Sequence, residues 1–154
     1  VNTAKILKAM NVNVIAYDAF QSEAGKQVAT YVELDELLAK SDFIFLHCPL
    51  FPSTEGIINK DNIAKMKDGV VIINNSRGPL VVEQDLYEAL ENDEIAAAGL
   101  DVLCQEPMSE TNPLRKIKDS KKLLITPHVA WASVEARTKL MGIILGQIKE
   151  YFQI

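Results

Sequence analysis

Three ionisable side chains between residues 77 and 128 are of the types that hold an anion and transfer a proton. Arg77 precedes a glycine, where backbone can approach a ligand closely, and its guanidinium could hold a carboxylate through two hydrogen bonds. His128 follows Thr126-Pro127, and an imidazole can exchange a proton with a substrate. Glu106 could fix the tautomer of that imidazole. Each residue alone also has a structural interpretation: a surface ion pair, a packed histidine or a solvated loop acid.

Asp18 ends an apolar run nearer the start of the chain and could bind a nucleotide. In dinucleotide-binding folds, an acidic residue after the second strand accepts hydrogen bonds from ribose hydroxyls; a turn aspartate is the alternative. A 2′-phosphate would be repelled there, and no Lys or Arg lies between residues 19 and 25, so NAD(H) is favoured over NADP(H). No G-x-G-x-x-G motif occurs, and counting back about 20 residues from Asp18 passes the first residue.

The pattern of apolar runs predicts the elements that position these residues. Strands are predicted at 12–17, 43–46, 70–73, 95–102 and 123–125, and helices at 3–10, 34–39, 61–66, 83–91 and 134–152. Continuously apolar strands separated by helices are typical of a parallel sheet with helices on both faces. The sequence therefore predicts a doubly wound α/β fold. Its ligands would bind at the carboxyl ends of the strands, where Asp18, Arg77 and His128 all lie.

Composition excludes several other classes of protein. The chain has 154 residues, 48% hydrophobic and 24% charged, which fits one globular domain rather than a disordered chain. A net charge of −5 without a basic cluster argues against nucleic-acid binding, and no apolar run reaches the roughly 18 residues of a membrane span. Cys48 and Cys104 form neither a disulfide framework nor a zinc-binding pattern, so we expect a cytoplasmic protein.

Three sequence blocks then occur in one order: Asn74–Gly78, Ala98–Pro107 and Thr126–His128. Together they resemble the D-isomer-specific 2-hydroxyacid dehydrogenases. Asn112–Leu114 and His128–Ser133 are most similar to the glycerate dehydrogenase (hydroxypyruvate reductase) branch. The resemblance runs through essentially the whole chain. It implies a Rossmann-like NAD-binding domain that lacks its first strand and glycine-rich loop, with residues 1–133 as a partial dinucleotide-binding domain and 134–154 as a C-terminal helix that in relatives packs toward the substrate domain.

The resemblance also implies a role for each candidate residue. Arg77 would bind the carboxylate of a 2-keto acid, His128 would protonate the carbonyl oxygen, and Glu106 would be the partner of His128. Asp101 would fix the nicotinamide carboxamide, and Asp18 would bind the ribose. Loop positions expected to line the cofactor are Cys48, Pro49, Thr54, Asn75 and Ser76, and Arg77, Asp101 and His128 are expected to contact it as well.

The function expected from the resemblance is hydride transfer between NAD(H) and a small 2-keto or 2-hydroxy acid, such as hydroxypyruvate/D-glycerate or glyoxylate, by a homodimer. Without a glycine loop and a second domain, we expect this chain alone to be inactive or nearly so. The wide apolar face of the 134–152 helix is expected to be displaced or to self-associate.

Two rival functions remain open from the sequence. One is a non-catalytic NAD(H)-sensing module. The other is a metal-binding protein that uses His47, Cys48, Cys104 and His128, although adjacent side chains such as His47 and Cys48 point to opposite faces of a strand.

Overall fold

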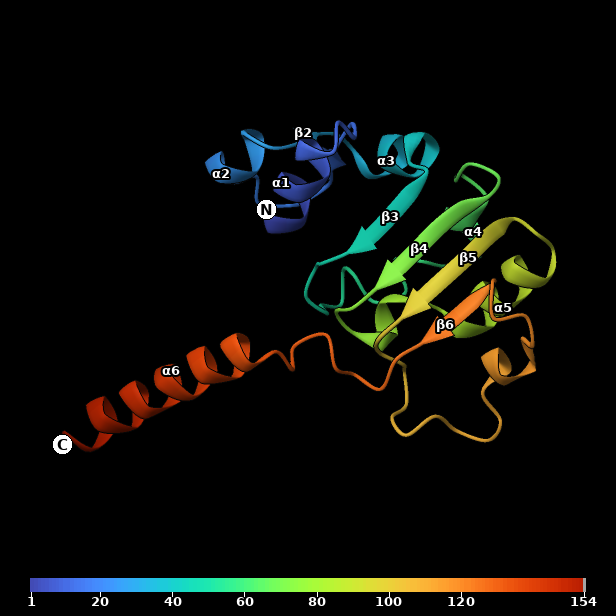
Figure 1. Ribbon diagram of the computed structural model, residues 1–154. Helices are drawn as coiled ribbons and strands as arrows, with labels where there is room; N and C mark the ends of the chain where they lie inside the picture. The colour runs from blue at the N-terminus through green and yellow to red at the C-terminus, as the bar shows by residue number, and fades with distance from the viewer. Residues whose placement is uncertain (154) are drawn as a thin grey trace.

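A four-stranded parallel sheet forms the centre of the computed structural model, which describes residues 1–153. Its strands are β3 (Phe43–Leu46), β4 (Val70–Asn74), β5 (Ile95–Leu100) and β6 (Leu123–Ile125), in the spatial order β3-β4-β5-β6. All neighbouring strands are parallel, so their arrowheads in Figure 1 point to one edge of the sheet. The predicted parallel α/β fold is confirmed.

Helices connect these strands, as the sequence pattern predicts. The chain contains α1 (Asn2–Ala9), α2 (Glu23–Lys26), α3 (Leu34–Lys40), α4 (Lys60–Ile63), α5 (Glu83–Glu91) and α6 (Val134–Phe152), with 3₁₀ helices η1 (Gly78–Leu80) and η2 (Pro113–Lys116). The predicted helix at 61–66 ends early, at Ile63, and the predicted strand at 95–102 ends at Leu100. The boundaries of α5, β3 and β6 agree with the prediction.

The first strand does not join the central sheet. The run predicted as a strand at 12–17 forms only β1 (Ile15–Ala16), which pairs in parallel with β2 (Thr30–Tyr31) in a separate two-stranded sheet. Figure 1 shows this small sheet with α1 and α2 to one side of the main sheet. β2 and α2 were not predicted, because neither Thr30–Tyr31 nor Glu23–Lys26 is an apolar run or carries an apolar period.

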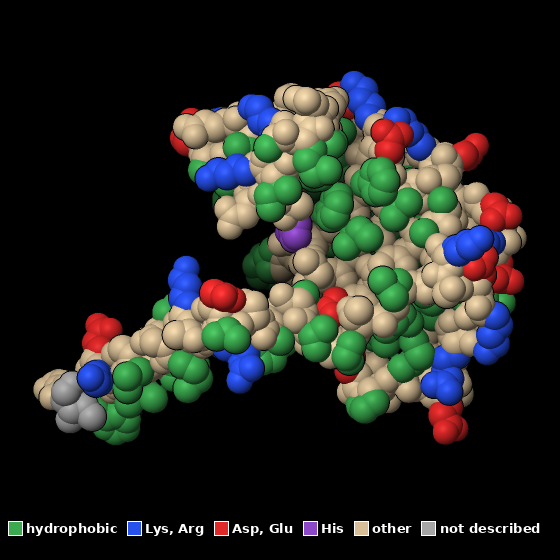
Figure 2. All heavy atoms as spheres, viewed as in Figure 1, with side chains coloured by type: hydrophobic (Ala, Val, Ile, Leu, Met, Phe, Trp, Pro, Cys, Tyr) green, Lys and Arg blue, Asp and Glu red, His purple; other side chains and the backbone are tan. Residues whose placement is uncertain are grey.

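Burial alternates along the central strands, so the two faces of the sheet differ. Ile44, Leu46 and Ile72 are buried on the face covered by α4 and α5. On the other face Phe43 is 61% exposed and Leu124 is 64% exposed. Figure 2 shows hydrophobic side chains gathered over this second face. The core therefore lies on one side of the sheet, whereas the sequence predicted helices on both faces.

Helix α6 lies apart from this core. Ser133 caps its start by accepting a hydrogen bond from the Ala136 amide, at 3.1 Å. All 19 residues of α6 are exposed, and Figure 1 shows the helix projecting from the sheet domain. Hydrophobic side chains run along the helix in Figure 2, and its expected displacement or self-association stays a prediction. No helix within residues 1–153 combines the length and the apolarity that crossing a bilayer requires.

Candidate active site

A hydrogen bond joins two of the residues expected to act together. His128 Nδ1 lies 2.7 Å from Glu106 Oε2, and each side chain is about two-fifths exposed (40% and 38%). The other carboxylate oxygen, Oε1, accepts a hydrogen bond from the Leu103 amide at 2.9 Å. This bond and the bond from His128 hold the pKa of Glu106 below its usual value. Because an ionised carboxylate only accepts, Nδ1 carries the proton and Nε2 is left to face a ligand.

The backbone of His128 has an unusual conformation. Its φ is +54°, in the left-handed region that non-glycine residues seldom adopt. The His128 amide donates to the Thr126 carbonyl at 3.0 Å, and its own carbonyl accepts from Trp131 Nε1 at 2.9 Å. Such conformations cost about 1–3 kcal/mol and persist where surrounding contacts hold them. The imidazole is therefore presented by a turn that is fixed on both sides.

Asp101, directly after β5, braces the turn that carries the histidine. Its Oδ1 accepts from Thr126 Oγ1 at 2.5 Å and from the Val129 amide at 2.9 Å, and Oδ2 accepts from the Ala130 amide at 2.8 Å. Burial alone would raise the pKa of Asp101, but these three bonds outweigh it and the pKa is lowered. Asp101 is only 8% exposed. Its contact with a nicotinamide carboxamide stays a prediction.

Thr126 is a hydrogen-bond partner of Asp101 that the sequence did not predict. Its hydroxyl donates to Asp101, and its amide donates to the Leu100 carbonyl at 2.9 Å, so it ties the end of β6 to the end of β5. The available signal was its position directly after a strand.

The loops after β3 and β4 surround a hollow of about 490 Å³. It is lined by His47, Cys48, Pro49, Leu50, Asn75, Ser76 and Arg77, five of which are predicted cofactor-lining residues. Thr54 lies beside it and donates through Oγ1 to the Pro49 carbonyl at 2.8 Å. Ser76 Oγ donates to the Leu46 carbonyl at 2.8 Å, which holds the two loops together. The structure thus brings most of the predicted loop residues to one place.

Arg77 is exposed at this hollow, and its guanidinium does not touch the histidine pair. Nη1 donates to the Ser76 carbonyl at 2.8 Å, while Asn74 Nδ2 donates to the Arg77 carbonyl at 2.8 Å. No contact in the described chain joins the guanidinium to Glu106 or His128. The two groups share only the carboxyl edge of the sheet, so their convergence on one substrate stays a prediction.

Asp18 lies in the smaller N-terminal sheet region. Its Oδ1 accepts from the Phe20 amide at 2.8 Å, so the turn role that the sequence left open is observed. Asp18 is also near Cys48: burial is the main cause that raises the pKa of the Cys48 thiol, and the Asp18 charge adds to it. The carboxylate is exposed, which leaves ribose binding as a prediction.

The metal-binding alternative gains no geometric support. Within residues 1–153, no three His, Cys, Asp or Glu side chains gather in a way that could hold a metal ion. His47 instead contacts Thr3 Oγ1 through Nε2 at 3.1 Å, and burial together with the charge of the N-terminus lowers its pKa.

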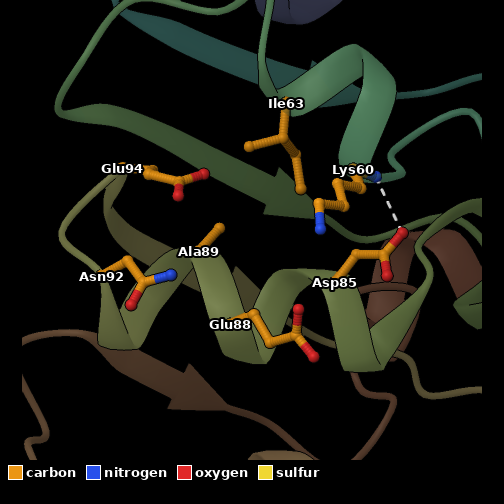
Figure 3. Close-up of a pocket in the computed structure, with 7 residues that line it drawn as sticks. All are labelled: Lys60, Ile63, Asp85, Glu88, Ala89, Asn92 and Glu94. Carbon is orange, nitrogen blue, oxygen red and sulfur yellow. Dashed lines mark hydrogen bonds between the residues drawn. The ribbon is translucent and has the colours of Figure 1, made fainter.

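A second, smaller pocket lies between α4 and α5, away from these groups. Figure 3 shows its lining residues, with the Lys60 amide bonded to Asp85 Oδ2 at 2.8 Å. Its volume is about 90 Å³, and it is lined by Lys60, Ile63, Asp85, Glu88, Ala89, Asn92 and Glu94. None of the predicted site residues lines it, and it is too small for a dinucleotide.

The residues at the carboxyl edge suit the two ends of NAD. The exposed carboxylate of Asp18 offers acceptors for ribose hydroxyls. The hollow beside Asn75 and Arg77 has the volume of a small-molecule site, about 300–1,000 Å³. The sequence contains no G-x-G-x-x-G segment, whose backbone amides would hold the pyrophosphate. Contact of these residues with either end of NAD stays a prediction.

Several known proteins match this chain in sequence. Residues 1–130 match the model of the D-isomer specific 2-hydroxyacid dehydrogenase NAD binding domain. A hydroxypyruvate reductase of Blautia hydrogenotrophica is 55% identical over 98% of this chain and 46% of its own length. A human glyoxylate reductase/hydroxypyruvate reductase is 42% identical over 89% of this chain and 42% of its own length.

Solved structures also match. D-lactate dehydrogenase from Aquifex aeolicus, complexed with NAD and lactic acid, superposes with a TM-score of 0.88 at 29% identity, over 97% of this chain and 49% of that one. The chain thus spans about half the length of the relatives that it matches.

Proposed function

We propose, on the premise that this chain belongs to the D-isomer specific 2-hydroxyacid dehydrogenase family and matches its NAD-binding domain, that it forms part of an oxidoreductase for small 2-hydroxy acids. NAD is the cofactor of this domain family. When bound, NAD(H) supplies or accepts the hydride. The observation that carries the proposal is the bond of 2.7 Å between His128 Nδ1 and Glu106 Oε2.

His128 is the proposed acid and base. Reduction of a ketone builds negative charge on its oxygen, and a proton donor close to that oxygen stabilises the transition state. Glu106 holds the proton on Nδ1, so Nε2 exchanges a proton with the substrate oxygen. In the oxidation direction neutral Nε2 takes the alcohol proton. The braced turn around His128 reduces the motion of the ring during this exchange.

Arg77 is the proposed carboxylate ligand. Its guanidinium is exposed at the mouth of the hollow of about 490 Å³, and a guanidinium binds a carboxylate through two parallel hydrogen bonds. Two-point binding orients the neighbouring carbonyl carbon. The positive charge also stabilises the oxyanion that forms.

The proposed substrate is hydroxypyruvate or glyoxylate, with D-glycerate or glycolate as the reduced acid. The support is the identity of 55% to a hydroxypyruvate reductase and of 42% to a glyoxylate reductase/hydroxypyruvate reductase. We further propose a cytoplasmic homodimer, for which the exposed apolar face of α6 and the two free cysteines are the support.

A chimera tests the function in a complete context. The chain would replace the matched segment of the Blautia hydrogenotrophica hydroxypyruvate reductase, and NADH oxidation would be followed with hydroxypyruvate, glyoxylate and pyruvate. We expect turnover, a fall of roughly 10²–10⁴-fold in kcat for His128→Asn, and unchanged NADH binding by calorimetry. Glu88→Gln, an exposed change on α5, is the matched control. A chimera that folds and binds NADH but reduces none of the three acids overturns the proposal.

We propose that the chain alone has little or no activity. The reasons are that the sequence lacks a glycine-rich loop to hold the pyrophosphate, and that His128 and Glu106 are about two-fifths exposed to water. Calorimetry with NADH and a hydroxypyruvate assay on the 154-residue chain test this. Robust turnover would refute it and leave the family function intact.

A further inference from the structure

The segment between β5 and η2 carries Glu106 but contains no regular helix or strand. Its position therefore depends on contacts with its neighbours. The carboxylate of Glu83, at the start of α5, makes two of them: Oε1 accepts from the Cys104 amide at 2.9 Å, and Oε2 accepts from Asn112 Nδ2 at 2.8 Å. One side chain thus ties down the segment on both sides of Glu106.

Asn112 itself is buried, and its side-chain nitrogen and oxygen each make one hydrogen bond. Asn112 is 7% exposed, and its Oδ1 accepts from the Leu114 amide at 2.9 Å. Its amide group would be left without a partner if Glu83 were removed, and a buried unpaired donor costs about 1–3 kcal/mol. The Glu83 contact is therefore a strong point of attachment.

The Cys104 contact lies next to the histidine pair. The Leu103 amide donates to Glu106 Oε1 at 2.9 Å, and the following amide, that of Cys104, donates to Glu83. Glu106 Oε2 then meets His128 Nδ1. The amide of Leu103 thus donates to Glu106, which also contacts the imidazole of His128. The next amide, that of Cys104, donates to Glu83.

Leu103 and Cys104 also contact the segment that carries Arg77. A Cβ built on Gly78 would lie 2.0 Å from the Leu103 carbonyl carbon and 2.4 Å from the Cys104 nitrogen, so the two backbones are in direct contact. Cys104 Sγ also donates to the Val81 carbonyl at 3.6 Å. Whatever fixes Leu103 and Cys104 fixes their distance from Arg77 as well.

We propose that Glu83 is a positioning residue that sets the Glu106–His128 pair by holding the 103–112 segment against the start of α5. The role in catalysis rests on the function proposed above, whereas the positioning itself is a property of this chain.

The two histidines and two cysteines of the chain provide the test. We expect the ring signals of His128 in a ¹H–¹⁵N spectrum to move or broaden in E83A and E83Q, and also in E106Q. The His47 signals should stay unchanged, because His47 contacts Thr3. Burial and then the Glu83 charge raise the pKa of the Cys104 thiol to about 11. Its alkylation at about pH 8 should therefore accelerate in E83Q, with no change at Cys48.

A double variant that exchanges the side chains of residues 83 and 112 distinguishes loss of this contact from a general loss of folding. In E83Q/N112D the amide and the carboxylate exchange places, so the buried hydrogen bond can re-form and the His128 signals should return toward those of the unmodified chain. E88Q on the same helix is the matched control. Unchanged His128 signals in both E83A and E83Q, alongside shifted signals in E106Q, would overturn the proposal. If the chimera is inactive but the His128 signals respond to E83A and E83Q as expected, only the proposed function is rejected.

Discussion

Thr126 Oγ1 donates to Asp101 Oδ1 across 2.5 Å, and this bond joins the chain just beyond β5 to the chain just beyond β6. Asp101 also accepts hydrogen bonds from the Val129 and Ala130 amides, so one carboxylate holds the turn around His128. The position of the proposed acid and base therefore depends on the ionisation of a second, nearly buried acid.

This relationship predicts that the turn loosens in acid. The pKa of Asp101 is lowered in the folded chain, so its ionisation contributes stability above its unfolded value of about 4, and that contribution is lost as the pH falls through the folded pKa. The lowered pKa of Glu106 acts in the same direction. Urea unfolding between about pH 2 and 6 should show Asp101→Asn with a flatter pH dependence than the unmodified chain. Asp42→Asn, which alters only the exposed pair with Lys67, should keep the original profile.

The contact between Gly78 and Leu103 predicts a destabilised alanine variant. A Cβ at position 78 would lie 2.0 Å from backbone atoms of Leu103, which cannot move aside as a side chain can. Gly78→Ala should lower the free energy of unfolding by about 1–3 kcal/mol or more in urea. Gly142→Ala, in α6 with nothing within 4 Å of its Cβ, should add about 0.5–1 kcal/mol to helix stability instead. Equal effects of the two changes would contradict the close contact.

The exposed carboxylate of Asp18 predicts the choice of cofactor. Repulsion of a 2′-phosphate by one charge about 4 Å away is worth about 1 kcal/mol in water, which corresponds to roughly fivefold in affinity. Asp18→Ser should therefore raise the affinity for NADPH relative to NADH by about that factor in the chimera. Calorimetric titration with both cofactors measures the ratio, and an unchanged ratio would mean that Asp18 only forms its turn with Phe20.

The apolar side chains of α6 predict association between chains. Leu140, Ile144 and Ile148 follow one another at intervals of four residues and are all exposed. Sedimentation velocity should show a species that grows with concentration, and the double change Leu140→Glu with Ile148→Glu should remove it. Gln147→Glu tests whether added charge alone has this effect. A monomer at every concentration would count against both association and the proposed homodimer.

Much of the fold was predictable because the strands of the central sheet are runs of apolar residues. β3 and β6 were located to the residue, since Phe43–Leu46 and Leu123–Ile125 are uninterrupted apolar runs between polar ends. β2 was missed, because Thr30 and Tyr31 alone give no period. The separation of β1 from the main sheet was not foreseen either, since pairing between strands depends on contacts that a run of residues does not record.

The candidate site was predictable in part, and mainly through resemblance. The sequence blocks placed Glu106 and His128 together, and the structure has them in contact. The contact of Asp101 with the cofactor stays a prediction, and its role in accepting hydrogen bonds from Thr126 and Ala130 was not predicted. Glu83 escaped notice because an acid in the first turn of a helix is an ordinary feature, and only the fold reveals that it meets Cys104 and Asn112.

β3 is an edge strand of the central sheet, and no other strand among residues 1–153 pairs with its outer side. An unpaired edge strand can accept a strand of another chain through main-chain hydrogen bonds. The exposed rings of Phe43 and Phe45 would favour such aggregation. The charged neighbours Lys40 and Asp42 are then gatekeepers against aggregation, whatever they contribute to the stability of the folded chain.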